Sequence, residues 1–125
     1  MKAILLLLWL LPIAFNVYLD RNGRKPNYLE MFMARGAIAI FHAALFNPQS
    51  WADYWPILLF QLTSFWLLFE LALNIIRKKP LLYYDTLEHD SGYIDRFFAW
   101  AGYKAHAIAK AVATVVCVIS ILILL

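Results

Sequence analysis

Ionisable and amide side chains that could do chemistry lie inside otherwise apolar stretches of this chain. Glu70 is the one formally charged residue between Trp55 and Ile76, in a run long enough to cross a bilayer. A charge in hydrocarbon must find a partner on another helix or line a path for ions or protons, because an unpaired charge there is costly. We therefore group the intramembrane polar residues as one predicted network: Arg35, His42, Gln61, Glu70, Asn74, His106 and Lys110.

Three chemistries are open to this network. Interhelical hydrogen bonds, with Glu70 paired to Arg35 or Lys110, would hold the helices together. The same residues could instead conduct protons or ions. A bis-histidine haem would need His42 and His106 at matched depth, but His106 lies near the start of its apolar stretch and His42 near the outer end of another. The depths disagree, and we predict no cofactor.

An acidic segment carries a second set of polar side chains. A hard cation or an acid–base pair at the membrane surface could use these groups, although their spacing matches no named metal motif. A solvated loop with a helix cap at Asp90 or Ser91 explains them without a function. We expect such a loop, with candidate metal ligands at Asp85, Glu88, His89, Asp90 and Asp95. We identify no Ser-His-Asp or Cys-His arrangement, and we predict no catalytic residue.

Composition places the whole chain in a membrane. The 125 residues are 64% hydrophobic and 15% charged, with a mean hydropathy of +0.67, whereas soluble domains are about 45–50% apolar. The net charge of +3 is small, and the basic residues flank apolar segments, so they indicate topology and not nucleic-acid binding. Cys117 is the only cysteine, which excludes an intrachain disulfide.

Four apolar stretches predict the elements that would position these residues. We expect transmembrane helices at about 3–19, 28–46, 55–76 and 105–125, and a short amphipathic interfacial helix at about 92–102. The first stretch lacks a small-x-small cleavage pattern, so it is an uncleaved span that Pro12 kinks. Ser50 and Asp53 have the spacing of a helix start. The predicted fold is one all-α membrane domain, 1–125.

The last stretch has two distinct faces. Ala105, Ala109 and Ala113 form a stripe of small residues that favours close helix packing. We expect lipid on the opposite side, which carries Ile108, Val112, Val115, Ile119 and Leu122.

Charges beside the spans predict the orientation. Arg77, Lys78 and Lys79 follow the third span directly and form a cytoplasmic basic anchor, where anionic lipid headgroups would bind. The turn 47–50 has no basic residue and should lie outside. Four spans then put both termini on the outer face.

The end of the third span and the segment after it resemble a known group. In order they carry Asn74, Arg77, Lys78, Lys79, Pro80, Tyr83, Tyr84, Asp95, Arg96, Phe97 and Phe98. Over about a quarter of the chain this order is similar to small uncharacterised multi-pass membrane proteins encoded by bacterial viruses and mobile elements, although Tyr84-Asp85 stands where we would expect a glycine. The resemblance implies a phage-related accessory protein of the bacterial inner membrane or a virus-associated membrane.

These observations predict a non-catalytic structural or accessory membrane subunit. It would act through helix packing and either self-associate, as a homo-oligomer, or join a larger membrane complex. The main alternative is a holin-like pore-former, which is similar in its small size and several spans, although such proteins usually carry a charged C-terminal tail and 121–125 is apolar. A second alternative is a small ion- or proton-conducting protein or a membrane-surface enzyme.

Overall fold

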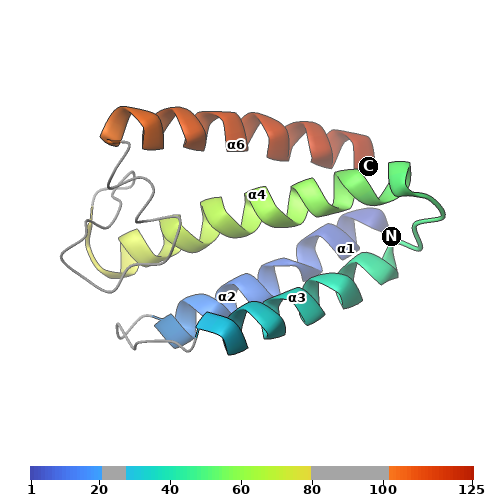
Figure 1. Ribbon diagram of the computed structural model, residues 1–125, viewed down its shortest axis with the longest axis horizontal. Helices are drawn as coiled ribbons and strands as arrows, with labels where there is room; N and C mark the ends of the chain where they lie inside the picture. The colour runs from blue at the N-terminus through green and yellow to red at the C-terminus, as the bar shows by residue number, and fades with distance from the viewer. Residues whose placement is uncertain (21–27, 80–101) are drawn as a thin grey trace.

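The computed structural model describes residues 1–20, 28–79 and 102–125, most of which are helical, and no strand occurs among them. The predicted all-α class is confirmed. The segment expected to form an interfacial helix, 92–102, lies outside the described residues except for Gly102. The candidate metal ligands of 85–95 all lie outside the described residues as well. The described helices are α1 (Lys2–Leu8), α2 (Leu10–Asp20), α3 (Tyr28–Leu45), α4 (Trp51–Ile76) and α6 (Tyr103–Leu124) (Figure 1).

The longest helix, α4, lies at the centre of the array. It packs against α6 on one side and against α2 and α3 on the other (Figure 1). Consecutive elements run in opposite directions, with α1 and α2 together forming the first pass. Both chain ends therefore lie at one end of the array, beside the turn that joins α3 to α4.

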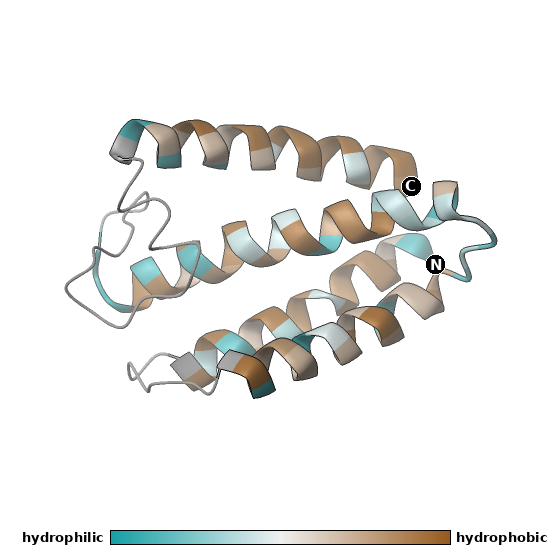
Figure 2. Ribbon diagram, in the orientation of Figure 1, coloured by the Kyte–Doolittle hydropathy of each residue, from teal (hydrophilic) through white to brown (hydrophobic). Residues whose placement is uncertain are grey.

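Three segments among the described residues are long and apolar enough to cross a membrane: Lys2–Leu19, Trp51–Ile76 and Lys104–Leu124. They coincide with three of the predicted spans, and Figure 2 shows hydrophobic residues along each of them, interrupted by isolated hydrophilic ones. The remaining helix, α3, is 18 residues long and carries Glu30 and His42 in its first and last turns. A crossing by α3 stays a prediction.

The first pass is broken one turn before its proline. At the break the Trp9 amide donates to the Leu6 carbonyl at 3.2 Å, which is an i→i−3 bond and ends α1. Pro12 accounts for the break, because it has no N–H to donate to the Leu8 carbonyl and its ring crowds that oxygen. The predicted kink is thus an interruption between α1 and α2.

Specific residues set the turn between α3 and α4. Helix α3 ends at Leu45, and Asn47 follows with a φ of 52°, a left-handed conformation that asparagine tolerates. The Ser50 side chain then accepts a hydrogen bond from the Asp53 amide at 3.4 Å, while the Asp53 carboxylate accepts from the Gln49 amide at 3.1 Å. The predicted helix start is confirmed, and this cap begins α4 four residues before the expected boundary at 55.

The other end of α4 closes in a Schellman turn. The Lys79 amide donates to the Asn74 carbonyl at 2.8 Å, and the Lys78 amide donates to the Ile75 carbonyl at 3.2 Å. Lys78 has a φ of 55°, at the position where helices usually place glycine.

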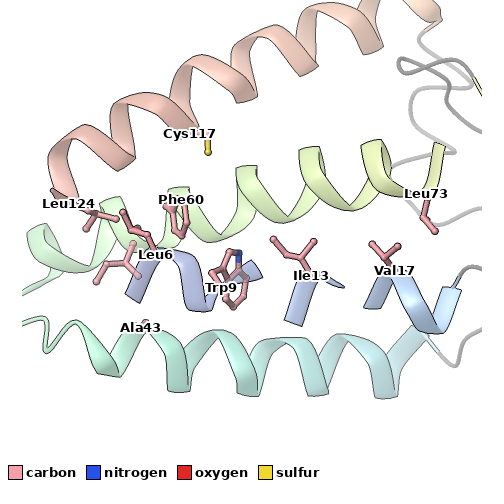
Figure 3. Close-up of a cluster of buried hydrophobic side chains, with 10 residues drawn as sticks. Leu6, Trp9, Ile13, Val17, Ala43, Phe60, Leu73, Cys117 and Leu124 are labelled. Carbon is pink, nitrogen blue, oxygen red and sulfur yellow. The ribbon is translucent and has the colours of Figure 1, made fainter. Parts of the chain in front are cut away.

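Apolar side chains fill the space on both sides of α4. Figure 3 shows residues of α1 and α2 pointing toward α4, and Cys117 pointing toward it from α6. The predicted lipid-facing side of α6 is confirmed as an exposed face, since Ile108, Val112, Val115, Ile119 and Leu122 are 50–69% exposed. The buried cluster consists of Leu6, Trp9, Ile13, Val17, Ala43, Ile57, Phe60, Leu73, Cys117 and Leu124.

Candidate functional site

The predicted intramembrane polar residues gather in three groups. Each group joins two or three helices, and we name the groups after the glutamate, the histidine and the arginine at their centres. Together they account for Arg35, His42, Gln61, Glu70, His106 and Lys110.

The glutamate group joins α4 to α6. The Glu70 carboxylate forms an ion pair with the Lys110 ammonium and accepts a hydrogen bond from the Trp66 indole N–H at 2.7 Å. His106 Nε2 lies 3.5 Å from Glu70 Oε2, and the Lys110 ammonium lies 4.5 Å from the centre of the Trp66 ring. Of the two predicted partners of Glu70, this contact identifies Lys110.

Helical spacing brings these four side chains together. Trp66 and Glu70 are four residues apart on α4, and His106 and Lys110 are four residues apart on α6, so each pair occupies one helix face. The Trp66 and His106 rings meet edge to face with centroids 6.1 Å apart. His106 is fully buried and Lys110 is 8% exposed, so the ion pair acts where solvent screens it weakly.

Two kinds of chemistry fit the glutamate group. A charge-assisted contact of this kind fastens one helix to another. The Lys110 amine and the His106 imidazole also lie beside one oxygen of the Glu70 carboxylate. Groups of these chemical types at this spacing can transfer protons to one another.

The histidine group joins α1, α3 and α4. His42 Nε2 lies 2.7 Å from the Leu5 carbonyl oxygen, which can only accept, so Nε2 donates. The Gln61 side-chain amide donates to the Ala39 carbonyl at 2.8 Å and lies 2.9 Å from His42 Nδ1. Nδ1 therefore accepts, and the contacts assign the neutral Nε2–H tautomer to His42.

The break in the first pass explains why His42 reaches Leu5. In an unbroken helix the Leu5 carbonyl would accept from the Trp9 amide, but that amide bonds to Leu6. His42 supplies the missing donor from α3. The Trp9 ring lies beside the imidazole, with centroids 4.9 Å apart, and is 4% exposed.

The arginine group joins α2, α3 and α4. Arg35 Nε donates to the Asn16 side-chain oxygen at 2.9 Å, and the Asn16 amide donates to the Pro12 carbonyl at 2.7 Å. The Arg35 guanidinium lies 5.1 Å and 5.4 Å from the ring centres of Phe65 and Phe69. The two rings stack with centroids 5.3 Å apart, so the charge lies over a paired aromatic surface.

The other predicted site residues lie near the end of α4. Asn74 is buried at 7% exposure, and Arg77, Lys78 and Lys79 are exposed. Within the described ranges, no group of three His, Cys, Asp or Glu residues could hold a metal ion. His42 and His106 belong to groups on opposite sides of α4.

Sequence reasoning passed over the two tryptophans of the site. The four-residue spacing from Glu70 is a signal that could have identified Trp66. Nothing in the sequence around Trp9 distinguishes it from an ordinary apolar residue, because its role depends on where α3 lies. Comparison of the chain with known proteins found no matching family model, no matching curated protein and no matching solved structure, so the three groups are the basis for assigning a function.

Proposed function

We propose that the protein is a non-catalytic integral membrane subunit that acts through helix packing, either with copies of itself or within a larger membrane complex. The observation that supports this most directly is the use of polar side chains between helices. Glu70 contacts Lys110, Arg35 contacts Asn16, and His42 contacts Leu5 and Gln61, in each case across a helix boundary. Such contacts hold helices together where lipid offers no hydrophobic driving force.

The proposal includes four crossings, with α3 as the fourth. Its 18 residues extend about 27 Å at 1.5 Å per residue, and it runs antiparallel to α4 alongside it. The basic residues at 77–79 support a cytoplasmic position for their end. Both termini are then outside, and 92–102 would form an interfacial helix on the cytoplasmic surface. The resemblance noted above suggests a phage-encoded protein in a bacterial inner membrane or a virus-associated membrane.

Helix α3 offers a surface on which association could occur. A Cβ added to Gly36 would meet nothing within 4 Å, and Ala37 beside it is exposed. A half-buried glycine with open space beside it and an exposed alanine allow a second helix to approach closely.

Native mass spectrometry and cross-linking in mild detergent test the association. We expect a defined oligomer or a co-purifying membrane protein, and we expect Gly36→Leu to disrupt it. Ala111→Leu, which places the same side chain at an exposed alanine of α6, is the matched control and should leave the assembly intact. A monomer that brings nothing with it would contradict the proposal.

One observation favours a second candidate, proton or ion conduction: Glu70, His106 and Lys110 meet at one carboxylate oxygen. Flux measured in liposomes separates the two candidates, since a conducting protein should lose its flux in Glu70→Gln. Induced expression tests the holin-like alternative. Rapid depolarisation and lysis would favour a pore, whereas neutral growth with incorporation into a complex would favour the subunit.

A further inference from the structure

Among the described residues, four exposed cations lie where α4 ends and α6 begins. We call Arg77, Lys78, Lys79 and Lys104 the basic end. The first three follow the last residue of α4, and Lys104 is in the first turn of α6. The ends of the two helices that carry them lie at the same end of the array (Figure 1).

The glutamate group allows the positions of these cations along the helix axes to be compared. Because Glu70 contacts Lys110, the two positions share one depth in antiparallel helices. Ile76, the last residue of α4, is six residues beyond Glu70, and Lys104 is six residues before Lys110, which are distances of about 9 Å each along the helix axes at 1.5 Å per residue. The cations of both helices therefore lie at nearly the same level, just beyond the apolar segments.

The backbone at Lys78 is a second sign that its charge matters. Its φ of 55° lies in the left-handed region, which favours glycine at this position of a Schellman turn. Cations near a helix C-terminus are favourable in general, but Arg77 and Lys79 already supply such charges without left-handed backbone. A lysine at 78 thus keeps a positive charge in an unfavourable conformation.

We propose that the basic end is a binding surface for the headgroups of anionic phospholipids. Headgroup phosphates of this class meet a protein at the level where apolar helices end, and clustered lysines and arginines attract them. Glu30, in the first turn of α3, is an exposed carboxylate at the same end of the array, and among the described residues the four cations of the basic end outnumber it. The inference rests on the proposed crossing of α4 and α6.

Lipid selectivity is the direct measurement. The full chain is reconstituted in phosphatidylcholine bilayers with a trace of spin-labelled phosphatidylglycerol or spin-labelled phosphatidylcholine, and the association of each probe is read from the motionally restricted component. We expect the phosphatidylglycerol probe to be preferred, and the preference to fall at high salt because salt screens exposed charges. Lys78→Gly and Lys104→Gln should each reduce it by up to about fivefold.

Matched variants separate headgroup binding from a structural effect. Lys78→Gly should raise thermal stability in phosphatidylcholine while it lowers the lipid preference, and Lys78→Arg should keep the preference. Asn47→Gly relieves the other left-handed residue at a helix end and should change stability only. Lys2→Gln removes an exposed lysine at the opposite end of the array and should leave the preference unchanged.

Two results would overturn the proposal: no preference in the wild-type protein, or a loss in Lys2→Gln equal to that in Lys78→Gly. Extraction by alkaline carbonate, which releases proteins that do not cross the bilayer, reports separately on the proposed crossing.

Discussion

The Glu70 carboxylate is held by groups from two helices. Trp66 donates to it from its own helix, and Lys110 neutralises it from α6. Removing one partner of a buried pair leaves the other charge uncompensated, which costs about 3–5 kcal/mol. Replacing both partners with apolar residues avoids that penalty.

Variants of the Glu70–Lys110 pair should lose stability according to whether one partner is removed or both are replaced. We expect Glu70→Leu to lower the free energy of unfolding by about 3 kcal/mol or more, because Lys110 is left buried and unpaired. Glu70→Gln should cost less, since its carbonyl oxygen still accepts from Trp66 and Lys110. The double variant Glu70→Leu with Lys110→Met should recover much of the loss. Unfolding in mixed micelles measures all three.

Lys104→Met removes an exposed lysine from the same helix and is the control for Lys110→Met. A stability that neither Glu70 variant changes would mean that Glu70 faces water. Conduction would show a different pattern, with proton flux lost in Glu70→Gln while the melting temperature stays near that of the wild type.

Gln61 connects α4 to two atoms of α3. Gln61→Leu removes the donor to the Ala39 carbonyl and leaves His42 Nδ1 buried without its donor, so the free energy of unfolding should fall by about 1–3 kcal/mol. Thr63→Val is the control, because the Thr63 hydroxyl bonds only to Leu59 of its own helix. Equal melting temperatures for the two variants would contradict this role of Gln61.

The polar members of the site were visible in the sequence because polar residues stand out in an apolar run. The sequence did not show that Glu70 would pair with Lys110 and not with Arg35, because the pairing depends on how far each helix is rotated and shifted against its neighbours. Arg35 lies instead over Phe65 and Phe69. An apolar run gives no sign that such rings will receive a cation.

At the scale of helices, the break in the first pass leaves a backbone carbonyl available for a contact with another helix. Pro12 interrupts the hydrogen bonds of one turn, and the Leu5 carbonyl is then bonded by His42. Backbone groups in a membrane need such replacement partners because water is not available to them.

Pro12→Ala restores a donor and should join α1 to α2. We expect slower amide hydrogen exchange for residues 8–12, because the new amide can bond to the Leu8 carbonyl. The His42 bond to Leu5 should weaken as the Trp9 amide returns to that carbonyl, which the imidazole nitrogen chemical shifts of His42 would report. Unchanged exchange at 8–12 would show that the break does not depend on Pro12.

Helices were easier to locate from the sequence than their ends. Apolar runs gave α4 and α6 within a few residues. The spacing of Ser50 and Asp53 predicted the start of α4, whereas the apolar run begins four residues after it. Glycine is the usual residue at the left-handed position of a Schellman turn. The left-handed backbone of Lys78 could therefore not be predicted from its residue type.

At the scale of the whole molecule, α4 divides the contacts into two sides. The glutamate group fastens α6 on one side, and the histidine and arginine groups fasten α1, α2 and α3 on the other. Helix α4 therefore contacts the helices on both sides.

Cysteine labelling checks the proposed topology. In a Cys117→Ala background, single cysteines at Lys2 and Gln49 should react with an impermeant reagent from outside, and one at Lys79 only from inside. All three positions are exposed and lie at or beyond helix ends. Labelling of Gln49 and Lys79 from the same side would show that α4 does not cross. Labelling of Lys2 and Gln49 from opposite sides would mean that only one of the first pass and α3 crosses.

The unequal lengths of neighbouring helices have a consequence for the bilayer itself. Helix α3 has 18 residues and α4 has 26, which correspond to about 27 Å and about 39 Å, whereas a typical hydrocarbon core is about 30 Å thick. If both cross, lipid beside α3 must thin while α4 must tilt, and each ångström of hydrophobic mismatch costs a fraction of a kcal/mol. A thinner membrane favours α3 and a thicker one favours α4, so membrane thickness would set the tilt of the central helix.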